Sequence, residues 1–302
     1  MTLYEIAYLL TPPIIMKVLR KSICYIPKLH KKNPSTLDQI IKTKEKMLII
    51  GNGPSLTKNL ERDIEKFKDF DCIVVNHFCE TKYYAQIKPK FYLLADPVYF
   101  GDIDTYNDWW KTKINNLIDS LLVNTQWDMN LIIPSIANNS DFLLRIHKNQ
   151  FIHPYLYNNK NLIRYDESNK IEKFKFWNKN LIEPPAQTCL NTCVWLAIFL
   201  RYKEAYIIGA DSNWLELIRV DQKTNELYIN DIHFYGQKSQ KVKLCKDSMA
   251  TPSSIGEELA SEAKAFNNYT ELKYYADYTG VKIYNVSEYS LIDAFERKKF
   301  DS

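Results

Sequence analysis

The sequence has few glycines, seven in 302 residues, where an average globular chain would hold about three times as many. Two of the seven, Gly51 and Gly53, fall within three residues of each other. Glycine permits tight turns and a close approach of the backbone to another group. The pair therefore predicts a tight turn at which the backbone approaches another group closely.

Long apolar runs and metal-ligand spacings are also absent. No uninterrupted apolar stretch approaches the roughly 20 residues that span a bilayer. Residues 3–26 lack the basic start and the cleavage site of a secretory signal. None of the six cysteines forms a CxxC pair or stands at zinc-ligand spacing from a histidine. We therefore expect reduced, mostly buried thiols in a cytoplasmic protein.

Composition and charge are those of an ordinary globular protein. Apolar residues make up 46% and charged residues 25%, a balance that excludes wholesale disorder. The length allows one large domain or two small ones. The net charge of +4 is too small to imply a nucleic-acid partner.

The basic charge is concentrated in residues 17–46. After a Pro-Pro pair, residues 14–23 place apolar side chains on one helical face and basic side chains on the other. Such a helix can lie on an anionic membrane surface, and an ordinary helix packed on the domain is the alternative. We expect residues 1–46 to form an N-terminal segment and linker, residues 1–27 to contact the membrane, and residues 47–302 to form the main domain.

The glycine pair lies between a strand pattern and a helix pattern. Met47–Ile50 is a buried-strand run, residues 51–56 read GNGPSL, and residues 58–67 carry apolar residues at helical spacing. Strand, glycine turn and helix form the first unit of an open α/β sheet. The turn is neither a Walker A loop nor GxGxxG. Its amides and the Ser55 hydroxyl are placed to meet a phosphate or nucleotide at the helix start.

Five further strand patterns follow along the chain. They are Cys72–Val75, Phe91–Ala95, Leu131–Ile133, Ala205–Ile208 and Lys282–Tyr284. Helical patterns intervene, most clearly over residues 188–200 and 257–279. Ligands of open α/β sheets bind beyond the carboxyl ends of the strands. That edge is expected to carry Asn52, Ser55, Asn76, Asp96, Asp211 and Asn285.

Residues 212–255 interrupt this alternation of strands and helices. A turn over residues 221–225 separates two strand-like pieces, and a polar and aromatic run with His233 and Tyr235 follows. A long excursion after a sheet strand is often a lid or an acceptor-binding segment. We expect this segment to close over the strand edge.

The motifs together resemble bacterial sialyltransferases of glycosyltransferase family forty-two and the related domain of motility-associated (Maf) flagellin glycosyltransferases. The resemblance spans residues 47–295, and GNGPSL is its most specific piece. The segments that carry it are LIIGNGPSL (48–56), DCIVVNHF (71–78), YLLADPVYF (92–100), LRYKEAYIIGAD (200–211) and KIYNVSEYSLIDAF (282–295).

The resemblance implies an α/β fold: a Rossmann-type, GT-A-like, mainly parallel sheet with helices on both faces and a lid insertion over about 212–255. It also implies transfer of sialic acid or another nonulosonate from a CMP donor to a glycan hydroxyl, with inversion. No essential metal is implied, and a role for Mg²⁺ stays open. The residues at donor-binding positions are Gly51, Asn52, Gly53, Ser55, Asn76, Asp96 and Thr188.

Inverting transfer needs a base that removes the proton of the acceptor hydroxyl and groups that stabilise the departing phosphate. His233 is the candidate for base or phosphate contact, with Tyr235 beside it. Asp211 or Asp96 is the carboxylate alternative, as base or sugar anchor. A structural hydrogen bond at Asp211 and a turn cap at Asp96 are the competing interpretations. His77 is a further candidate, and a half-buried histidine after a strand is the alternative.

Other residues that suggest site chemistry have ordinary explanations as well. Asp102 and Asp104 match the Asp-x-Asp pattern of metal-using glycosyltransferases, but they end no obvious strand, so we expect no metal site there. Tyr99 and Trp214 could stack on a sugar or base, as could Tyr235, and core packing is the alternative.

These observations predict a glycosyltransferase of bacterial surface polysaccharide, lipooligosaccharide or O-antigen synthesis, located in the cytoplasm and peripheral at the inner face of the cell membrane. Its partners would be a nucleotide-sugar donor and a glycan or lipid-linked acceptor. A pterin pyrophosphokinase-like transferase that uses ATP is one alternative, and a non-catalytic nucleotide-sugar binding module is another. Whether the chain forms a homo-oligomer stays open.

Overall fold

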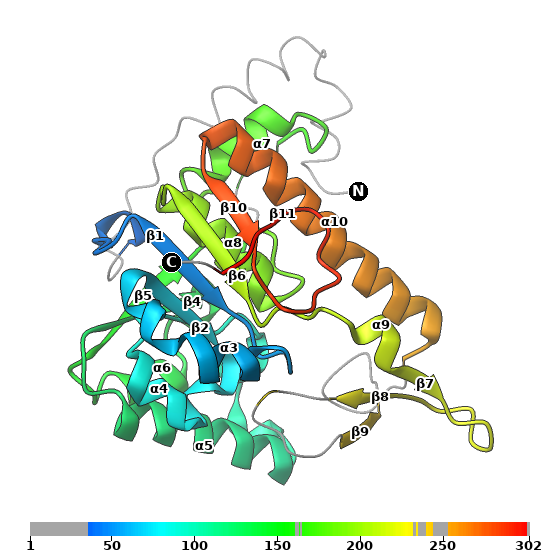
Figure 1. Cartoon of the computed structure of the whole chain (residues 1–302). Coiled ribbons are helices and arrows are strands. Elements are labelled where there is room, and N and C mark those ends of the chain that lie inside the picture. The colour runs from blue at the N-terminus through cyan, green and yellow to red at the C-terminus, as the bar shows by residue number, and fades with distance from the viewer. Residues whose placement is uncertain are drawn as a thin grey trace, which may run out of the picture.

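The computed structural model describes residues 36–160, 163, 165–231, 234, 240–243 and 253–300. Its centre is an eight-stranded sheet in the order β11-β10-β6-β1-β2-β3-β4-β5, in which every neighbouring pair is parallel. Helices lie around this sheet (Figure 1). The predicted α/β class with a mainly parallel sheet is confirmed.

The strands are short, as is usual in such sheets. They are β1 (Lys46–Ile50), β2 (Asp71–Val75), β3 (Phe91–Leu93), β4 (Met129–Pro134), β5 (Ile152–Tyr157), β6 (Glu204–Ile208), β10 (Lys282–Asn285) and β11 (Glu296–Arg297). The helices between them are α3 (Leu56–Asp63), α4 (Lys82–Ile87), α5 (Asp108–Asn124), α6 (Asp141–Ile146), α7 (Lys170–Trp177), α8 (Cys189–Phe199) and α10 (Ile255–Thr279).

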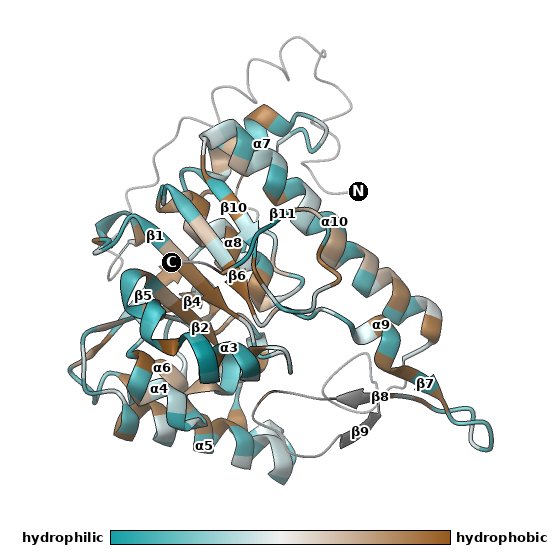
Figure 2. Cartoon of the chain, in the orientation of Figure 1, coloured by the Kyte–Doolittle hydropathy of each residue, from teal (hydrophilic) through white to brown (hydrophobic). Residues whose placement is uncertain are grey.

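Helices cover both faces of the sheet because successive strand residues point to opposite faces. In β1, Met47 and Ile49 belong to the core cluster that contains residues of α7, α8 and α10. Leu48 and Ile50 belong to the cluster that contains residues of α3, α4, α5 and α6. Figure 2 shows the resulting pattern, with hydrophobic residues along the central strands. The prediction of helices on both faces is confirmed.

All six predicted strands are present in the eight-stranded sheet. This sheet also holds two strands that the sequence does not indicate. β5 follows β4 at one edge of the sheet, and its residues 153–156 are only half buried. β11 is two residues long and exposed at the other edge. Edge strands bury less apolar surface than central ones, so neither gives the continuous apolar run that marks a buried parallel strand.

The connectivity reverses between β1 and β6. From β1 the chain adds β2, β3, β4 and β5 on one side, and then β6, β10 and β11 on the other. In doubly wound sheets the loops at such a reversal diverge, and a crevice opens at the carboxyl ends of the two strands. The fold therefore places its candidate crevice between the loops that follow β1 and β6.

The segment predicted as a lid contains a short helix, α9 (Trp214–Leu217), and a separate antiparallel sheet of β7 (Ile218–Val220), β8 (Leu227–Asp231) and β9 (Gln240–Lys243). The predicted turn over residues 221–225 joins β7 to β8. The amide of Phe234 donates to the Asn52 carbonyl at 3.1 Å, and its ring lies 5.4 Å from that of Phe78. One point of this segment therefore contacts the turn after β1.

Two further sequence expectations concern thiols and membrane spans. The cysteines in the described part of the chain carry no disulfide; Cys72, Cys79 and Cys193 are buried and Cys189 is partly so. No helix in the described ranges is both long and apolar enough to cross a bilayer. The predicted membrane segment, residues 1–27, lies outside the described residues.

Candidate functional site

A pocket of about 500 Å³ lies at the reversal between β1 and β6. It is lined by the turn after β1, the residues that follow β2, β3 and β6, and the loop leading into α8. Its volume lies in the range of small-molecule sites. The predicted residues that line it are Asn52, Gly53, Asn76, Asp96, Thr188, Asp211 and Trp214. Strands far apart in sequence thus bring most of the predicted set together.

The glycine turn is shaped by contact with the loop after β6. The amide of Gly51 donates to the Ile208 carbonyl at 2.8 Å, and that of Gly53 to the Gly209 carbonyl at 2.8 Å. A Cβ at Gly51 would overlap the Gly209 carbonyl oxygen, and one at Gly53 would overlap the Asp211 carboxylate. The two glycines are therefore required by the close approach of two backbone loops, before any ligand is considered.

Ser55 is hydrogen-bonded to Asp211. Its hydroxyl donates to Asp211 Oδ1 at 2.5 Å, and its amide donates to Oδ2 at 3.1 Å. In this structure the donors that the sequence assigns to a phosphate are taken by a buried carboxylate. Both Asp211 oxygens accept hydrogen bonds, so the structural hydrogen bond named as the alternative is present, and a role of Asp211 as base or sugar anchor stays a prediction. Ser55 and Gly51 are also absent from the pocket lining.

Asp211→Asn tests how the Asp211 carboxyl group contributes to stability at different pH, because the pKa of this group differs between the folded and the unfolded protein. Burial raises the pKa of Asp211 above its ordinary value of 3.8, and the hydrogen bonds from Ser55 oppose this only in part. Such a group contributes its full stability below pH 3.8 and loses that contribution as the pH rises through the folded pKa. The unfolding free energy of the wild type, relative to the variant, should therefore fall as the pH rises above about 4. Urea unfolding between about pH 3 and pH 7 measures this difference, and a difference that grows with pH would contradict it.

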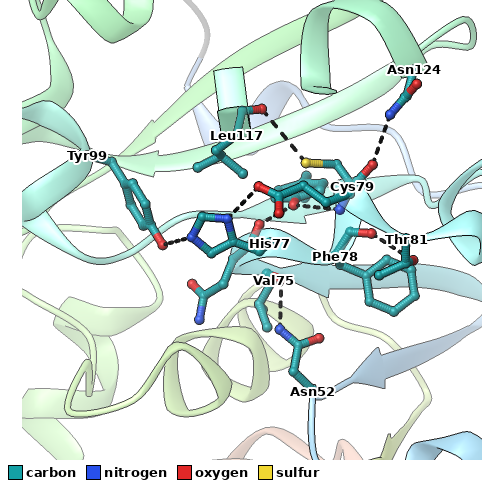
Figure 3. Close-up of polar contacts among 12 residues, drawn as sticks. Asn52, Val75, His77, Phe78, Cys79, Thr81, Tyr99, Leu117 and Asn124 are labelled. Atoms are coloured by element: carbon teal, nitrogen blue, oxygen red, sulfur yellow. Dashed lines mark hydrogen bonds and ion pairs between the residues drawn. The ribbon is translucent and has the colours of Figure 1, made fainter. Parts of the chain in front are cut away.

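Asn52 and Asn76 place two amide side chains in the pocket. The Asn52 side-chain amide donates to the Val75 carbonyl at 3.2 Å (Figure 3), and its Oδ1 is buried without a hydrogen-bond partner among the described residues. Asn76 follows β2 with a φ of 53°, a left-handed conformation that asparagine tolerates better than most residues. Its Oδ1 accepts from the Cys189 thiol at 3.2 Å, and its amide nitrogen, which has no acceptor among the described residues, can donate to a ligand.

The N-terminus of α8 forms another wall. Thr188 caps this helix: its Oγ1 accepts from the Asn191 amide at 3.2 Å and lies 3.4 Å from the Tyr269 hydroxyl. Burial raises the pKa of the neighbouring Cys189 thiol to about 11, so this thiol stays protonated at neutral pH. The sequence assigned Thr188 to the donor, and the structure adds a capping role that fixes where α8 begins.

Asp96 is the exposed carboxylate of the pocket. Its Oδ1 accepts from the Val98 amide at 2.9 Å, which is the predicted turn cap, while it also lines the pocket. No basic side chain lines the pocket within the described ranges. Asn285 lies away from the pocket: it is fully buried and donates to Ser290 and Ile292.

The remaining candidates among the described residues have structural partners outside the pocket. His77 lies between Glu80 and Tyr99 (Figure 3), with its Nδ1 2.7 Å from the Glu80 carboxylate and its Nε2 3.5 Å from the Tyr99 hydroxyl. Neither His77 nor the buried Tyr99 lines the pocket. Asp102 accepts from the Asp104 amide at 3.1 Å, and no three His, Cys, Asp or Glu residues within the described ranges are grouped to hold a metal.

The predicted catalytic residues His233 and Tyr235 lie outside the described residues, so their roles stay predictions. The structure also brings in residues that sequence reasoning missed. Gln187 and Asn213 line the pocket from loops without strand or helix periodicity. Ser212, at a φ of 49°, lines it as well, and no pattern in the sequence indicates a left-handed serine.

No family model matches this chain, and neither does any curated protein. Among solved structures, the chain is similar to a Maf glycosyltransferase from Magnetospirillum magneticum AMB-1, with 12% identity and a TM-score of 0.47. The similarity covers 86% of this chain and 34% of that one, so this chain spans about a third of that protein's length.

Proposed function

We propose that this protein is a glycosyltransferase that binds a nucleotide-sugar donor at the reversal between β1 and β6. The observation that carries the proposal is the pocket itself, which lies at the place where doubly wound sheets bind nucleotides. A CMP-activated sialic acid or other nonulosonate is the proposed donor, and a glycan hydroxyl is the acceptor. The choice of donor and reaction rests on the sequence motifs.

The side chains of the pocket suit the base and ribose of a nucleotide. Asn52, Asn76 and Gln187 offer amide groups, which can donate to and accept from a base or a sugar hydroxyl. The loop after β6 continues through Asn213 and Trp214 into the predicted lid. A bound sugar extending from the pocket would meet this segment, where an acceptor could also be held.

The donor phosphate needs cations, which the described lining lacks, and the acceptor hydroxyl needs a group that removes its proton. Residues 232–252 contain His233 and four lysines against a single acid, Asp247. Phe234, inside this stretch, hydrogen-bonds to Asn52 at the turn after β1. In our proposal this basic stretch neutralises the donor phosphate and His233 takes the acceptor proton, with Asp96 as the carboxylate alternative.

Asn76→Gly tests the pocket as the nucleotide site. Glycine keeps the left-handed backbone and removes only the amide, so CMP should bind about tenfold more weakly, the loss of one or two hydrogen bonds. Isothermal titration with CMP, UDP, GDP and ATP, with and without Mg²⁺, measures the affinities. CMP binding that does not depend on Mg²⁺ is expected.

Asn139→Gly is the matched control, because Asn139 also has a positive φ of 67° and is exposed outside the pocket lining. Its CMP affinity should equal that of the wild type. Binding of ATP alone, and only with Mg²⁺, would favour pyrophosphate transfer instead. If CMP binds but no sugar is transferred from a CMP donor to any glycan, the protein is a binding module. If Asn76→Gly and Asn139→Gly bind CMP with equal affinity, the pocket is not the nucleotide site.

A further inference from the structure

A second groove, of about 840 Å³, shares no lining residue with the pocket. Its walls are the end of α3 with the start of the next 3₁₀ helix (Arg62–Lys66), residues 286–288 after β10, and residues 297–300, which begin with the last residue of β11. We name it the C-terminal groove. Its lining holds five basic side chains and two acidic ones.

The two acids of the C-terminal groove are already paired. Asp63, which is buried, lies 2.8 Å from the Arg62 guanidinium and 3.2 Å from the Lys66 ammonium. Burial alone would raise the pKa of Asp63, but these two partners hold it below its ordinary value. Glu288 lies 2.9 Å from Arg62. The carboxylates therefore neutralise only the α3 side of the groove.

The other three cations stand on the C-terminal segment without a carboxylate within the described ranges. Arg297 donates to the Ser287 carbonyl at 2.7 Å, and the Lys298 ammonium lies 4.5 Å from the centre of the Tyr284 ring. Lys299 is exposed and has no carboxylate partner in the part of the chain that the structure describes. Three like charges that line one groove repel one another, and a bound anion would relieve that repulsion.

The backbone holds these cations in place before any ligand arrives. Arg297 pairs in parallel with Asn285 in the sheet, and the amide of Lys298 donates to the Asn285 carbonyl at 3.2 Å. Phe300 is buried, with its ring 5.7 Å from those of Phe67 and Phe70. A segment anchored on both sides of its cations loses little further freedom when it binds.

We infer that the C-terminal groove binds a phosphate-bearing ligand, with Arg297, Lys298 and Lys299 as its contacts. A planar guanidinium and two ammonium groups lining one groove suit a phosphate, whose oxygens accept from several donors at once. The groove adjoins the nucleotide pocket: the Ser287 hydroxyl accepts from the amide of Ala210, which lines that pocket, at 3.1 Å. The inference does not depend on the proposed function.

The test is titration of the full chain with inorganic pyrophosphate at low salt. The groove variant carries Arg297→Gln, Lys298→Gln and Lys299→Gln, and the control carries Lys148→Gln, Lys175→Gln and Lys179→Gln, three lysines outside both pockets. The groove variant should bind pyrophosphate at least about tenfold more weakly, and the control should match the wild type. A double variant that keeps Arg297, and with it the bond to Ser287, should show part of the loss.

A second arm separates the sources of the phosphate. Sedimentation with vesicles of phosphatidylglycerol and phosphatidylcholine is compared with phosphatidylcholine alone. Loss of anionic-vesicle binding in the groove variant alone, with pyrophosphate binding unchanged, would identify a lipid headgroup. Equal behaviour of the groove variant and the control in both arms overturns the inference. CMP affinity should be unchanged in the groove variant, so this test and that of the proposed function fail separately.

Discussion

Gly51→Ala is expected to lower the free energy of unfolding by about 3 kcal/mol or more, because the new methyl group meets only backbone. A Cβ there would overlap the Gly209 carbonyl oxygen, lie 2.9 Å from its carbon and 3.3 Å from the Ala210 Cα. Neither loop can move freely, since the Gly51 and Gly53 amides bond to the loop after β6. Urea unfolding followed by circular dichroism measures the loss.

Gly256→Ala is the control for this prediction. Gly256 lies near the start of α10, and beyond its chain neighbours and the backbone of its own helix, no atom of the described residues lies within 4 Å of the place that the new methyl group would take. Alanine should therefore be neutral there or stabilise by up to about 1 kcal/mol. The same result at both positions would show that the loops after β1 and β6 separate readily. In that case the close approach of these two loops would not be a fixed feature of the fold.

Burial explains which elements the sequence predicts well. Met47–Ile50 and Cys72–Val75 lie in the middle of the sheet, are buried on both faces and read as unbroken apolar runs. β5 has the sequence IHPYLY and lies at the sheet edge, where its histidine and proline are tolerated. β5 forms because it pairs in parallel with β4. The sequence of β5 itself does not indicate that pairing.

In the candidate site, the sequence predicts the residues that follow strands but not the contacts between loops. Asn52, Asn76 and Asp96 were predicted together because each follows a strand, and parallel strands deliver their carboxyl ends to one edge. The bond between Ser55 and Asp211 joins residues 156 positions apart, and it exists because two loops approach each other. No local pattern shows that approach, so the sequence does not indicate that the Ser55 donors already have an acceptor in Asp211.

Asp71→Ala is expected to lower the free energy of unfolding by about 3 kcal/mol, because several donors lose their acceptor at once. Asp71 begins β2 and is buried. Its carboxylate accepts from the amides of Thr43 and Lys44 at 2.9 and 3.2 Å, from the Thr43 hydroxyl, and from the Tyr202 hydroxyl at 2.6 Å. It therefore joins the chain before β1, the start of β2 and the loop after α8. Asp69→Ala, two positions away and exposed, should change stability by less than about 0.5 kcal/mol.

The Tyr202 hydroxyl provides the decisive comparison for Asp71. Tyr202 is 1% exposed, so in Asp71→Ala its hydroxyl is left buried without its acceptor. Adding Tyr202→Phe removes that unpaired group and should recover about 1 kcal/mol of the loss. Tyr202→Phe alone should instead destabilise the protein, because it leaves the carboxylate one donor short. If the two single losses simply add, the bond between the two side chains contributes nothing, and the carboxylate stabilises this junction through Thr43 and Lys44 alone.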